Sequence, residues 1–258
     1  MSGEALYSTE RADKILAVLR EQGSASVNYL AGYFNVSGAT IRTDLTKLES
    51  AGEVIRTHGG AMLKSSLQRE LRICDRINED KKELIADKAL ELIQNEDTIL
   101  LDTGTTMQFL AQSLLRSSIS RLRIYSIDLE VLRILEARDD YELYLLGGRI
   151  RNGFHYCYGT QIVDALEKYN FEKLFLASSA ISFEHGLTVT NSELSRIKQT
   201  MIKSSKSICL LADSTKLGRI DFESFARLDE IDTLIMDNSI SDADKKRLEE
   251  EIGKVILV

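Results

Sequence analysis

The sequence predicts an α/β protein of two domains, a small one at residues 1–62 and a larger one at residues 77–258. Three observations lead to this prediction. Two short helical patterns and a glycine-bounded hairpin pattern lie in the first domain. In the second, short apolar runs alternate with helical patterns, which is typical of a mostly parallel sheet covered on both faces. Between them, residues 63–76 mix apolar and charged residues without a period, so we expect a linker there.

The small domain is expected to begin with a helix at residues 9–21, followed by Gly23. Residues 24–26 then form a short strand that pairs with the hairpin. A second helix follows, with one apolar stripe made of Val27, Leu30 and Ala31. The chain turns at Asn35-Val36, and Ser37 is a suitable N-cap for a third helix because its hydroxyl can accept from a backbone N–H. The apolar residues of that helix recur at i, i+4 and i+7: Ile41, Leu45 and Leu48.

The opposite face of the third helix carries small and hydroxyl side chains flanked by basic ones: Ala39, Thr43 and Thr46 beside Arg42 and Lys47. This pattern suits a helix in the major groove of DNA, where bulky side chains would hold the helix away from the base edges. A solvated helix face explains the pattern equally well by itself. The next segment favours the DNA interpretation, because Gly52-Glu53 and Gly59-Gly60 bracket a β-prone run at residues 54–57 that is typical of a wing.

Several motifs of this domain match a known family. They include RADKILAVL at residues 11–19 and RTHGGA at residues 56–61, with Leu30-Ala31, Val36-Ser37, Thr40-Ile41-Arg42, Asp44-Leu45, Leu48-Glu49 and Gly52 between them. Together they resemble the winged helix-turn-helix of the DeoR family of bacterial transcriptional regulators. Family members usually carry two arginines before the aspartate, and this chain has Arg42-Thr43 there. The residues expected to face DNA are Ser37, Thr40, Arg42, Thr43, Lys47, Arg56, His58 and Gly59.

The net charge of −7 bears on this interpretation. Up to Leu63 the chain has six Lys and Arg against seven Asp and Glu, and the remainder has 27 against 33. Because phosphate contacts supply most of the affinity of non-specific DNA binding, we expect such binding to be weak. Recognition of one operator needs only a locally positive surface, and a homodimer or homotetramer would present several copies of it.

Other features exclude further classes. No run of about 18 apolar residues suggests a membrane span, and the polar start of the chain lacks a signal core, so we expect a cytoplasmic protein with no membrane partner. The three cysteines, Cys74, Cys157 and Cys209, lie far apart in the sequence. This spacing favours reduced thiols over a disulfide framework or a metal site. We expect no cofactor and no metal.

The larger domain alternates two kinds of pattern. Helices are expected at residues 78–94, 106–115, 128–137, 161–169, 192–203 and 241–251. Strands are expected at residues 98–101, 122–125, 142–146, 173–177, 208–212, 233–236 and 255–258. This order predicts a Rossmann-like sheet, and in open sheets of this kind ligands bind at the carboxyl ends of the strands.

The end of the first predicted strand carries a hydroxyl-rich turn, Asp102-Thr103-Gly104-Thr105-Thr106, that leads directly into a helix. Free N–H groups at a helix start and three threonine hydroxyls make a suitable seat for a phosphate. An ordinary capped turn between a strand and a helix is the alternative. The Walker A pattern is absent, so little supports binding of a nucleoside triphosphate.

Later strand ends carry further polar residues. Ser126 ends the second strand, and Gly147-Gly148-Arg149 follows the third; paired glycines allow close backbone approach to a ligand, and an arginine binds phosphate or hydroxyls. Ser178-Ser179 and the segment from Asp213 to Lys216 follow two others. Lys198 lies on the helix between those two. A lysine and an aspartate on converging loops could act as general base and anion anchor, or form a solvated pair.

The larger domain also resembles its DeoR-family counterpart, through DTGTT, LGGR, GLT, the helix with Lys198 and LADSTKLG. In that family this domain is similar to ribose-5-phosphate isomerase and binds a phosphorylated sugar as effector. The resemblance implies phosphate contacts at Thr103 to Thr106 and sugar contacts near Asp102, Arg149, Lys198, Asp213 and Lys216. The chain departs from the family at Leu194, where members often have glutamate, and at residues 177–181, where they have a GADGI-like segment.

The leading interpretation is therefore a transcriptional regulator, most often a repressor in such families, that binds operator DNA and a phosphorylated sugar. The alternative is a sugar-phosphate isomerase-like enzyme with an accessory helical domain. Such an enzyme needs an acid and a base over a closed pocket, and the sequence shows no carboxylate pair for that role. The enzyme would also leave the winged helix unexplained. A third interpretation is an α/β interaction protein.

Overall fold

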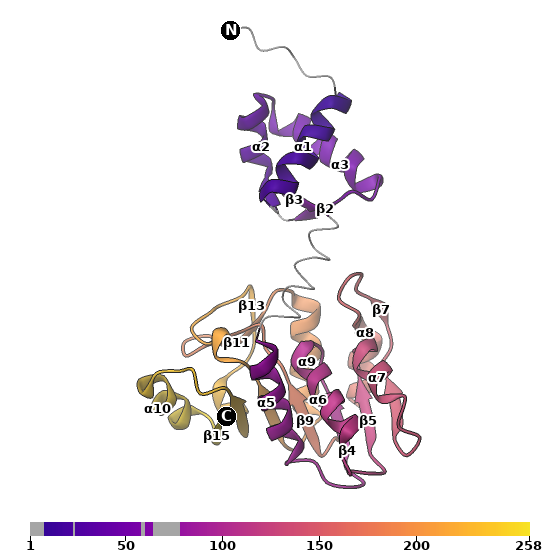
Figure 1. Cartoon of the computed structure of the whole chain (residues 1–258), viewed down its shortest axis with the longest axis vertical. Helices are drawn as coiled ribbons and strands as arrows, with labels where there is room; N and C mark the ends of the chain where they lie inside the picture. The colour runs from indigo at the N-terminus through magenta and orange to yellow at the C-terminus, as the bar shows by residue number, and fades with distance from the viewer. Residues whose placement is uncertain (1–7, 23, 58–59, 64–77) are drawn as a thin grey trace. The chain divides into compact units, whose positions relative to one another are not determined.

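The computed structural model of the chain describes residues 8–22, 24–57, 60–63 and 78–258 (Figure 1). Close contacts group the chain into two compact units, Met1–Ile77 and Asn78–Val258. Leu63 is the last residue of a strand, and the rest of the linker predicted at residues 63–76 lies outside the described residues. Among the residues described, every helix is too short or too polar to cross a membrane.

The first unit has the predicted elements in the predicted order. They are α1 (Ser8–Gln22), β1 (Ser24–Ser26), α2 (Val27–Phe34), α3 (Gly38–Ser50), β2 (Val54–Thr57) and β3 (Gly60–Leu63). The strands form an antiparallel sheet in the order β1-β3-β2. Ala25 of β1 lies opposite Ala61 of β3, which confirms that residues 24–26 pair with the wing. A side chain on Gly60 would meet the carbonyl oxygen of Ala25 at 2.1 Å, so this pairing requires glycine there.

Local hydrogen bonds and one ion pair shape the helix-turn-helix. Asn35 takes a left-handed conformation with φ 50° after α2, and Ser37 caps α3 by accepting from the N–H of Thr40 at 3.1 Å. Ile41, Leu45 and Leu48 are buried in the core of the unit, as their spacing predicts. Behind them, Arg11 of α1 lies 2.6 Å from Asp44 of α3, with both side chains buried. This ion pair joins the first and third helices.

Seven parallel strands form the sheet of the second unit, in the order β15-β14-β12-β9-β4-β5-β6. Their bounds are β4 (Thr98–Leu101), β5 (Arg123–Ser126), β6 (Glu142–Leu145), β9 (Lys173–Leu176), β12 (Ile208–Leu211), β14 (Thr233–Met236) and β15 (Lys254–Leu257). The α-helices are α5 (Glu79–Leu90), α6 (Thr105–Arg116), α7 (Leu129–Leu135), α8 (Thr160–Leu166), α9 (Ser192–Lys203) and α10 (Asp242–Glu251). The predicted fold class is confirmed.

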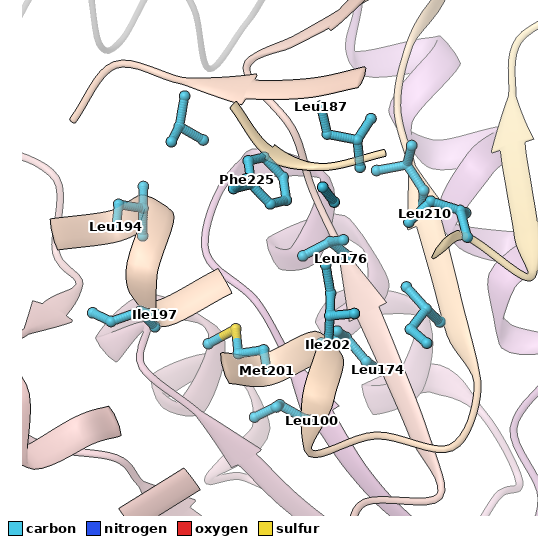
Figure 2. Packing of buried hydrophobic residues seen from close by; sticks show 14 of the residues in the cluster. Leu100, Leu174, Leu176, Leu187, Leu194, Ile197, Met201, Ile202, Leu210 and Phe225 are labelled. Carbon is cyan, nitrogen blue, oxygen red and sulfur yellow. The ribbon is translucent and has the colours of Figure 1, made fainter. Parts of the chain in front are cut away.

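Alternation along the strands separates two cores. Ile99 and Leu101 of β4 pack with α5, α6 and α7, the helices that cover one face of the sheet (Figure 1). Leu100 packs on the other face, where α9 presents Ile197, Met201 and Ile202 to β9 and β12 (Figure 2). Strands buried on both faces show no hydrophobic alternation in their sequence, which is why short apolar runs predicted them.

Two small antiparallel sheets were not predicted. The hairpin of β7 (Arg149–Ile150) and β8 (Cys157–Tyr158) precedes α8, and β10 (Ala180–Ser182), β11 (Gly186–Val189) and β13 (Glu223–Ala226) form a second sheet. Strands of two to four residues contain too few positions for a period to show.

Several predicted helices end earlier in the structure. The N–H groups of Leu92 and Ile93 bond to carbonyls three residues back, which ends α5 at Leu90 and not at residue 94. The same geometry at Lys168 and Tyr169 follows α8, which ends at Leu166.

The Arg11–Asp44 pair gives a stability prediction. We expect Asp44→Ala to lower the unfolding free energy of the first unit by about 3–5 kcal/mol, because it removes the carboxylate partner of a buried guanidinium. Amide hydrogen exchange of α1 and α3 in the full chain measures this. Asp13 lies exposed on α1, so Asp13→Ala is the matched control and should leave exchange unchanged. Equal effects of the two substitutions would contradict a stabilising role for the pair.

Candidate functional sites

The exposed face of α3 carries the side chains expected to face DNA. Arg42, Thr43 and Lys47 are exposed, on the side away from the buried Ile41, Leu45 and Leu48. The threonines are partly engaged within the helix, since the Thr43 hydroxyl donates to the carbonyl of Ala39 at 3.1 Å. Their oxygens can still accept hydrogen bonds, whereas the long basic side chains can donate. The face therefore offers both donors and acceptors to base edges and phosphates.

The start of α3 and the wing complete this surface. The hydroxyls of Ser37 and Thr40 lie 2.9 Å apart at the start of the helix. Both residues therefore take part in the helix cap, in addition to the DNA contact predicted for them. Arg56 of β2 is exposed and donates to the Thr46 hydroxyl of α3 at 3.3 Å, which places its guanidinium beside the helix. The predicted contacts His58 and Gly59 lie outside the described residues.

The strand order of the second unit defines where a ligand crevice should lie. From β4 the chain builds the sheet through β5 to β6, and then returns to place β9 on the other side of β4. The switch point is therefore between β4 and β9, and crevices form at the carboxyl ends of strands there. Asp102 follows β4, and Ala177 follows β9.

A buried ion pair occupies this switch point. Lys198 of α9 donates from Nζ to Oδ2 of Asp102 and also, at 2.9 Å, to the carbonyl of Ala177. The N–H of Ala177 donates to the same Oδ2 at 2.9 Å. Asp102 and Lys198 are 0% and 3% exposed, so neither is solvated. Within the part of the chain that the structure describes, the buried atoms Oδ1 of Asp102 and Oγ of Ser195 have no hydrogen-bond partner.

Asp213 has other partners than Lys198. It is buried, and it accepts from the backbone N–H and the hydroxyl of Thr215 and, at 3.2 Å, from the amide of Asn78. Its role in the structure is to cap the 3₁₀ turn η1 (Ser214–Lys216), which carries the half-exposed Lys216. The lysine and aspartate considered as one pair from the sequence thus have separate environments.

The turn from Asp102 to Thr106 is held by Asp128, which was not among the residues predicted for the site. Asp128, the N-cap of α7, accepts from the Thr103 hydroxyl at 2.7 Å and from the N–H of Gly104 at 3.1 Å. Its other oxygen accepts from two N–H groups of α7. Burial raises the pKa of Asp128, and these hydrogen bonds oppose the rise. The sequence feature that could have identified Asp128 is its position as an acidic residue at a predicted strand end, two residues after Ser126.

The first turn of α6, which follows Gly104, has backbone N–H groups without partners inside the helix. Gly104 has φ 120°, a conformation that favours glycine. The first helical hydrogen bond runs from Gln108 to the carbonyl of Gly104, so the N–H groups of Thr105 and Thr106 belong to the open first turn. Thr105 is half-buried and Thr106 is buried. Positive dipole ends of this kind attract anions.

The remaining predicted residues divide into structural and exposed ones. Ser126 is buried, and its hydroxyl accepts from the N–H of Asp128 at 3.0 Å. Gly147 and Gly148 are exposed, and a side chain on Gly148 would meet the carbonyl oxygen of Tyr158 at 2.5 Å. Arg149 is exposed; its guanidinium lies 4.5 Å from the ring centre of Tyr158 and 3.8 Å from the Glu193 carboxylate of α9.

A second acidic centre lies beside η1. Lys81 of α5 lies 2.8 Å from Asp237, whose oxygens also accept from the N–H and hydroxyl of Ser214. Burial by itself would raise the pKa of Asp237, but hydrogen bonds, chiefly those from Lys81 and the Ser214 N–H, outweigh it and lower the pKa to about 2. This group ties α5 to the end of β14.

A cavity of about 550 Å³ lies elsewhere in the second unit. Its lining residues come from the turn after β10, from β13 and η2 (Leu228–Glu230), and from the end of α10: Phe183, Glu184, His185, Gly186, Ser224, Arg227, Leu228, Asp229, Glu250 and Glu251. No residue predicted for the effector site is among them.

Two family models match the chain. A DeoR-like helix-turn-helix domain matches residues 11–67, and a DeoR C terminal sensor domain matches residues 77–238. The HTH-type transcriptional repressor GlcR of Bacillus subtilis is 32% identical over 90% of this chain and 89% of its own length. The lactose phosphotransferase system repressor of Staphylococcus epidermidis is 34% identical over 96% of this chain and 98% of its own. Among solved structures, ribose 5 phosphate isomerase A from Neisseria gonorrhoeae has a TM-score of 0.39 at 15% identity, over 53% of this chain and 52% of that one, which is too weak to bear on function.

The lowered pKa of Asp237 predicts a pH dependence. Its ordinary value is 3.8 and its value in the fold about 2, so the stability it contributes is complete above about pH 4 and is lost as the pH falls through 2. We expect Asp237→Asn to cost about 2 kcal/mol at pH 7 and to reduce the loss of stability between pH 4 and pH 2. Urea unfolding of both proteins across this range measures it. Parallel pH profiles for the two proteins would refute the assignment.

Proposed function

Because the chain belongs to the DeoR family of transcriptional regulators, we propose that it represses a carbohydrate uptake or catabolism operon, binds the operator through α3, and responds to a phosphorylated sugar. The observation that carries this proposal is the match of both units, in order, to the DNA-binding and sensor domains of one family. The family membership decides against the alternative of an isomerase-like enzyme. Relatives named as sugar-operon repressors support the choice of operon.

The DNA contact is proposed for the exposed face of α3 and the wing. Arg42 and Lys47 carry the positive charge of that face, and Ser37, Thr40 and Thr43 its short polar groups. Arg56, His58 and Gly59 of the wing contact the backbone or the minor groove. With so few basic residues, one copy has little phosphate affinity. A homodimer or homotetramer on repeated half-sites, in the cytoplasm where operator DNA lies, supplies the rest.

The effector site is proposed at the switch point between β4 and β9. Asp128 already engages the Thr103 hydroxyl and the Gly104 N–H, so the phosphate is held chiefly by the first turn of α6, at Thr105 and Thr106. The sugar lies toward Asp102, where a donated hydroxyl would satisfy the unpartnered Oδ1. Its other contacts come from residues around the crevice: Ser126, Gly147, Gly148, Arg149, Lys198, Asp213 and Lys216.

The first test of this proposal is DNA binding. We expect Arg42→Ala to weaken operator binding by about fivefold or more in gel-shift titrations, since a base contact of arginine is worth about 1–3 kcal/mol. Lys14→Ala removes one exposed positive charge from α1 in the same unit and should change binding much less. Promoter fragments beside the gene serve as probes. Equal binding by Arg42→Ala and the wild-type protein, or no retardation of any fragment at low salt, would refute the assignment.

The second test concerns the effector. We expect phosphorylated sugars, and not the same sugars without phosphate, to raise the melting temperature. At a ligand concentration a hundredfold above Kd, binding should raise the unfolding free energy by about 3 kcal/mol. Thr105→Asp should abolish the shift by placing a negative charge in the phosphate seat. Thr160→Asp is a matched control, because Thr160 begins α8 after Gly159 in the same local context. A shift that survives Thr105→Asp would show that the phosphate binds elsewhere.

A further inference from the structure

The edge strand β6 exposes apolar side chains. It is the last strand of the seven-stranded sheet, and among the strands that the structure describes it pairs with β5 alone. Tyr144 and Leu145 are 39% and 45% exposed. Tyr144 stacks on Tyr125 of β5 with ring centres 4.4 Å apart, and the ring centre of the exposed Tyr169 lies 5.2 Å from that of Tyr125. An aromatic surface therefore continues from the sheet to its open edge.

Two residues of this edge strand point their backbone N–H and C=O groups away from the sheet. Glu142 and Leu146 donate from their N–H groups to Leu122 and Ser126, both at 2.8 Å. Because strand residues alternate, the N–H and C=O groups of Leu143 and Leu145 face away from β5. Open edges in natural sheets are usually blocked by lysine, proline, a bulge or an inward charge. The run Leu143 to Leu146 has none of these.

The opposite edge of the sheet is better covered. The strand there, β15, begins with Lys254, and Val255 and Leu257 pack against the core that includes α9. Its residues after Lys254 are half-buried, in contrast to the exposed Tyr144 and Leu145. Each edge strand begins with one exposed charged residue, but the residues that follow are more exposed in β6 than in β15, so β6 is the more open edge.

We propose that β6 pairs with β6 of a second copy of this chain, antiparallel about a two-fold axis at Tyr144. In this register Leu143 of each copy lies opposite Leu145 of the other, so their outward N–H and C=O groups form hydrogen bonds. The two Tyr144 rings meet at the axis, where side chains of a non-hydrogen-bonded pair are closest. A two-fold axis closes the assembly at two copies along this edge.

The charge pattern selects the antiparallel arrangement and the identical partner. Glu142 is the charged residue of β6, and antiparallel pairing places it opposite Leu146 of the other copy. The two Glu142 side chains are then four residues apart along the strand, about 13 Å. A parallel arrangement would set these two acids side by side, which is destabilising. A surface that fits itself in this way points to a homodimer interface.

The experiment is a mass measurement of the full chain by light scattering after size exclusion. Leu145→Pro removes an N–H that faces only the partner, and proline is tolerated at such positions of an edge strand. Leu145→Lys places a charge at the edge instead. Both variants should have half the mass of the wild-type particle. At protein concentrations low enough for the wild-type dimer to dissociate, their melting curves should equal that of the wild-type protein. Phe222→Lys, at an 80% exposed apolar residue outside β6, should keep the wild-type mass.

Amide hydrogen exchange of the wild-type protein gives a readout that needs no variant. The N–H groups of Leu143 and Leu145 should be protected from exchange at concentrations where the protein is a dimer, and unprotected in the variants. A monomeric wild-type protein, edge variants of wild-type mass, or unprotected N–H groups at both leucines would each overturn the proposal. These measurements use neither DNA nor sugar, so failure of the proposed function would leave them unaffected.

Discussion

The buried ion pair between Asp102 and Lys198 is the interaction that organises the carboxyl ends of β4 and β9 in the second unit. Two charges removed from water are tolerated only with close geometry and further hydrogen bonds. Ala177 supplies two such hydrogen bonds: its N–H donates to the aspartate, and its carbonyl accepts from the lysine. Because Asp102 follows β4, Ala177 follows β9 and Lys198 belongs to α9, the pair joins three elements at the switch point.

Asp128 extends this organisation to the neighbouring strand. It holds the turn before α6, caps α7 and lies in a bridge with Tyr156 next to β8. These contacts connect the turn before α6, where the phosphate is proposed to bind, with the hairpin that carries Arg149. An effector changes DNA affinity only by binding two states unequally. If the effector binds as proposed, the contacts of Asp128 are the ones in this unit that it would reach first.

Much of the fold could be predicted from local patterns. The apolar spacing of Ile41, Leu45 and Leu48 and the cap at Ser37 placed α3 correctly, and the family resemblance drawn from short motifs is confirmed by the matches to both domains. The helix with Lys198 was placed at its observed bounds. Short antiparallel strands such as β7 and β10 could not be predicted, because they contain too few residues to show a period.

The sequence by itself determined the order and type of the main elements, the family, and which polar residues stand at the strand ends. These properties depend on periodicity and capping, which act within a few residues. Only the tertiary structure decided the partners: Lys198 pairs with Asp102 across 96 positions, and Asp128 holds a turn 25 residues earlier. A charged side chain takes the partner that the sheet order brings beside it once both leave water, and local sequence carries no record of that order.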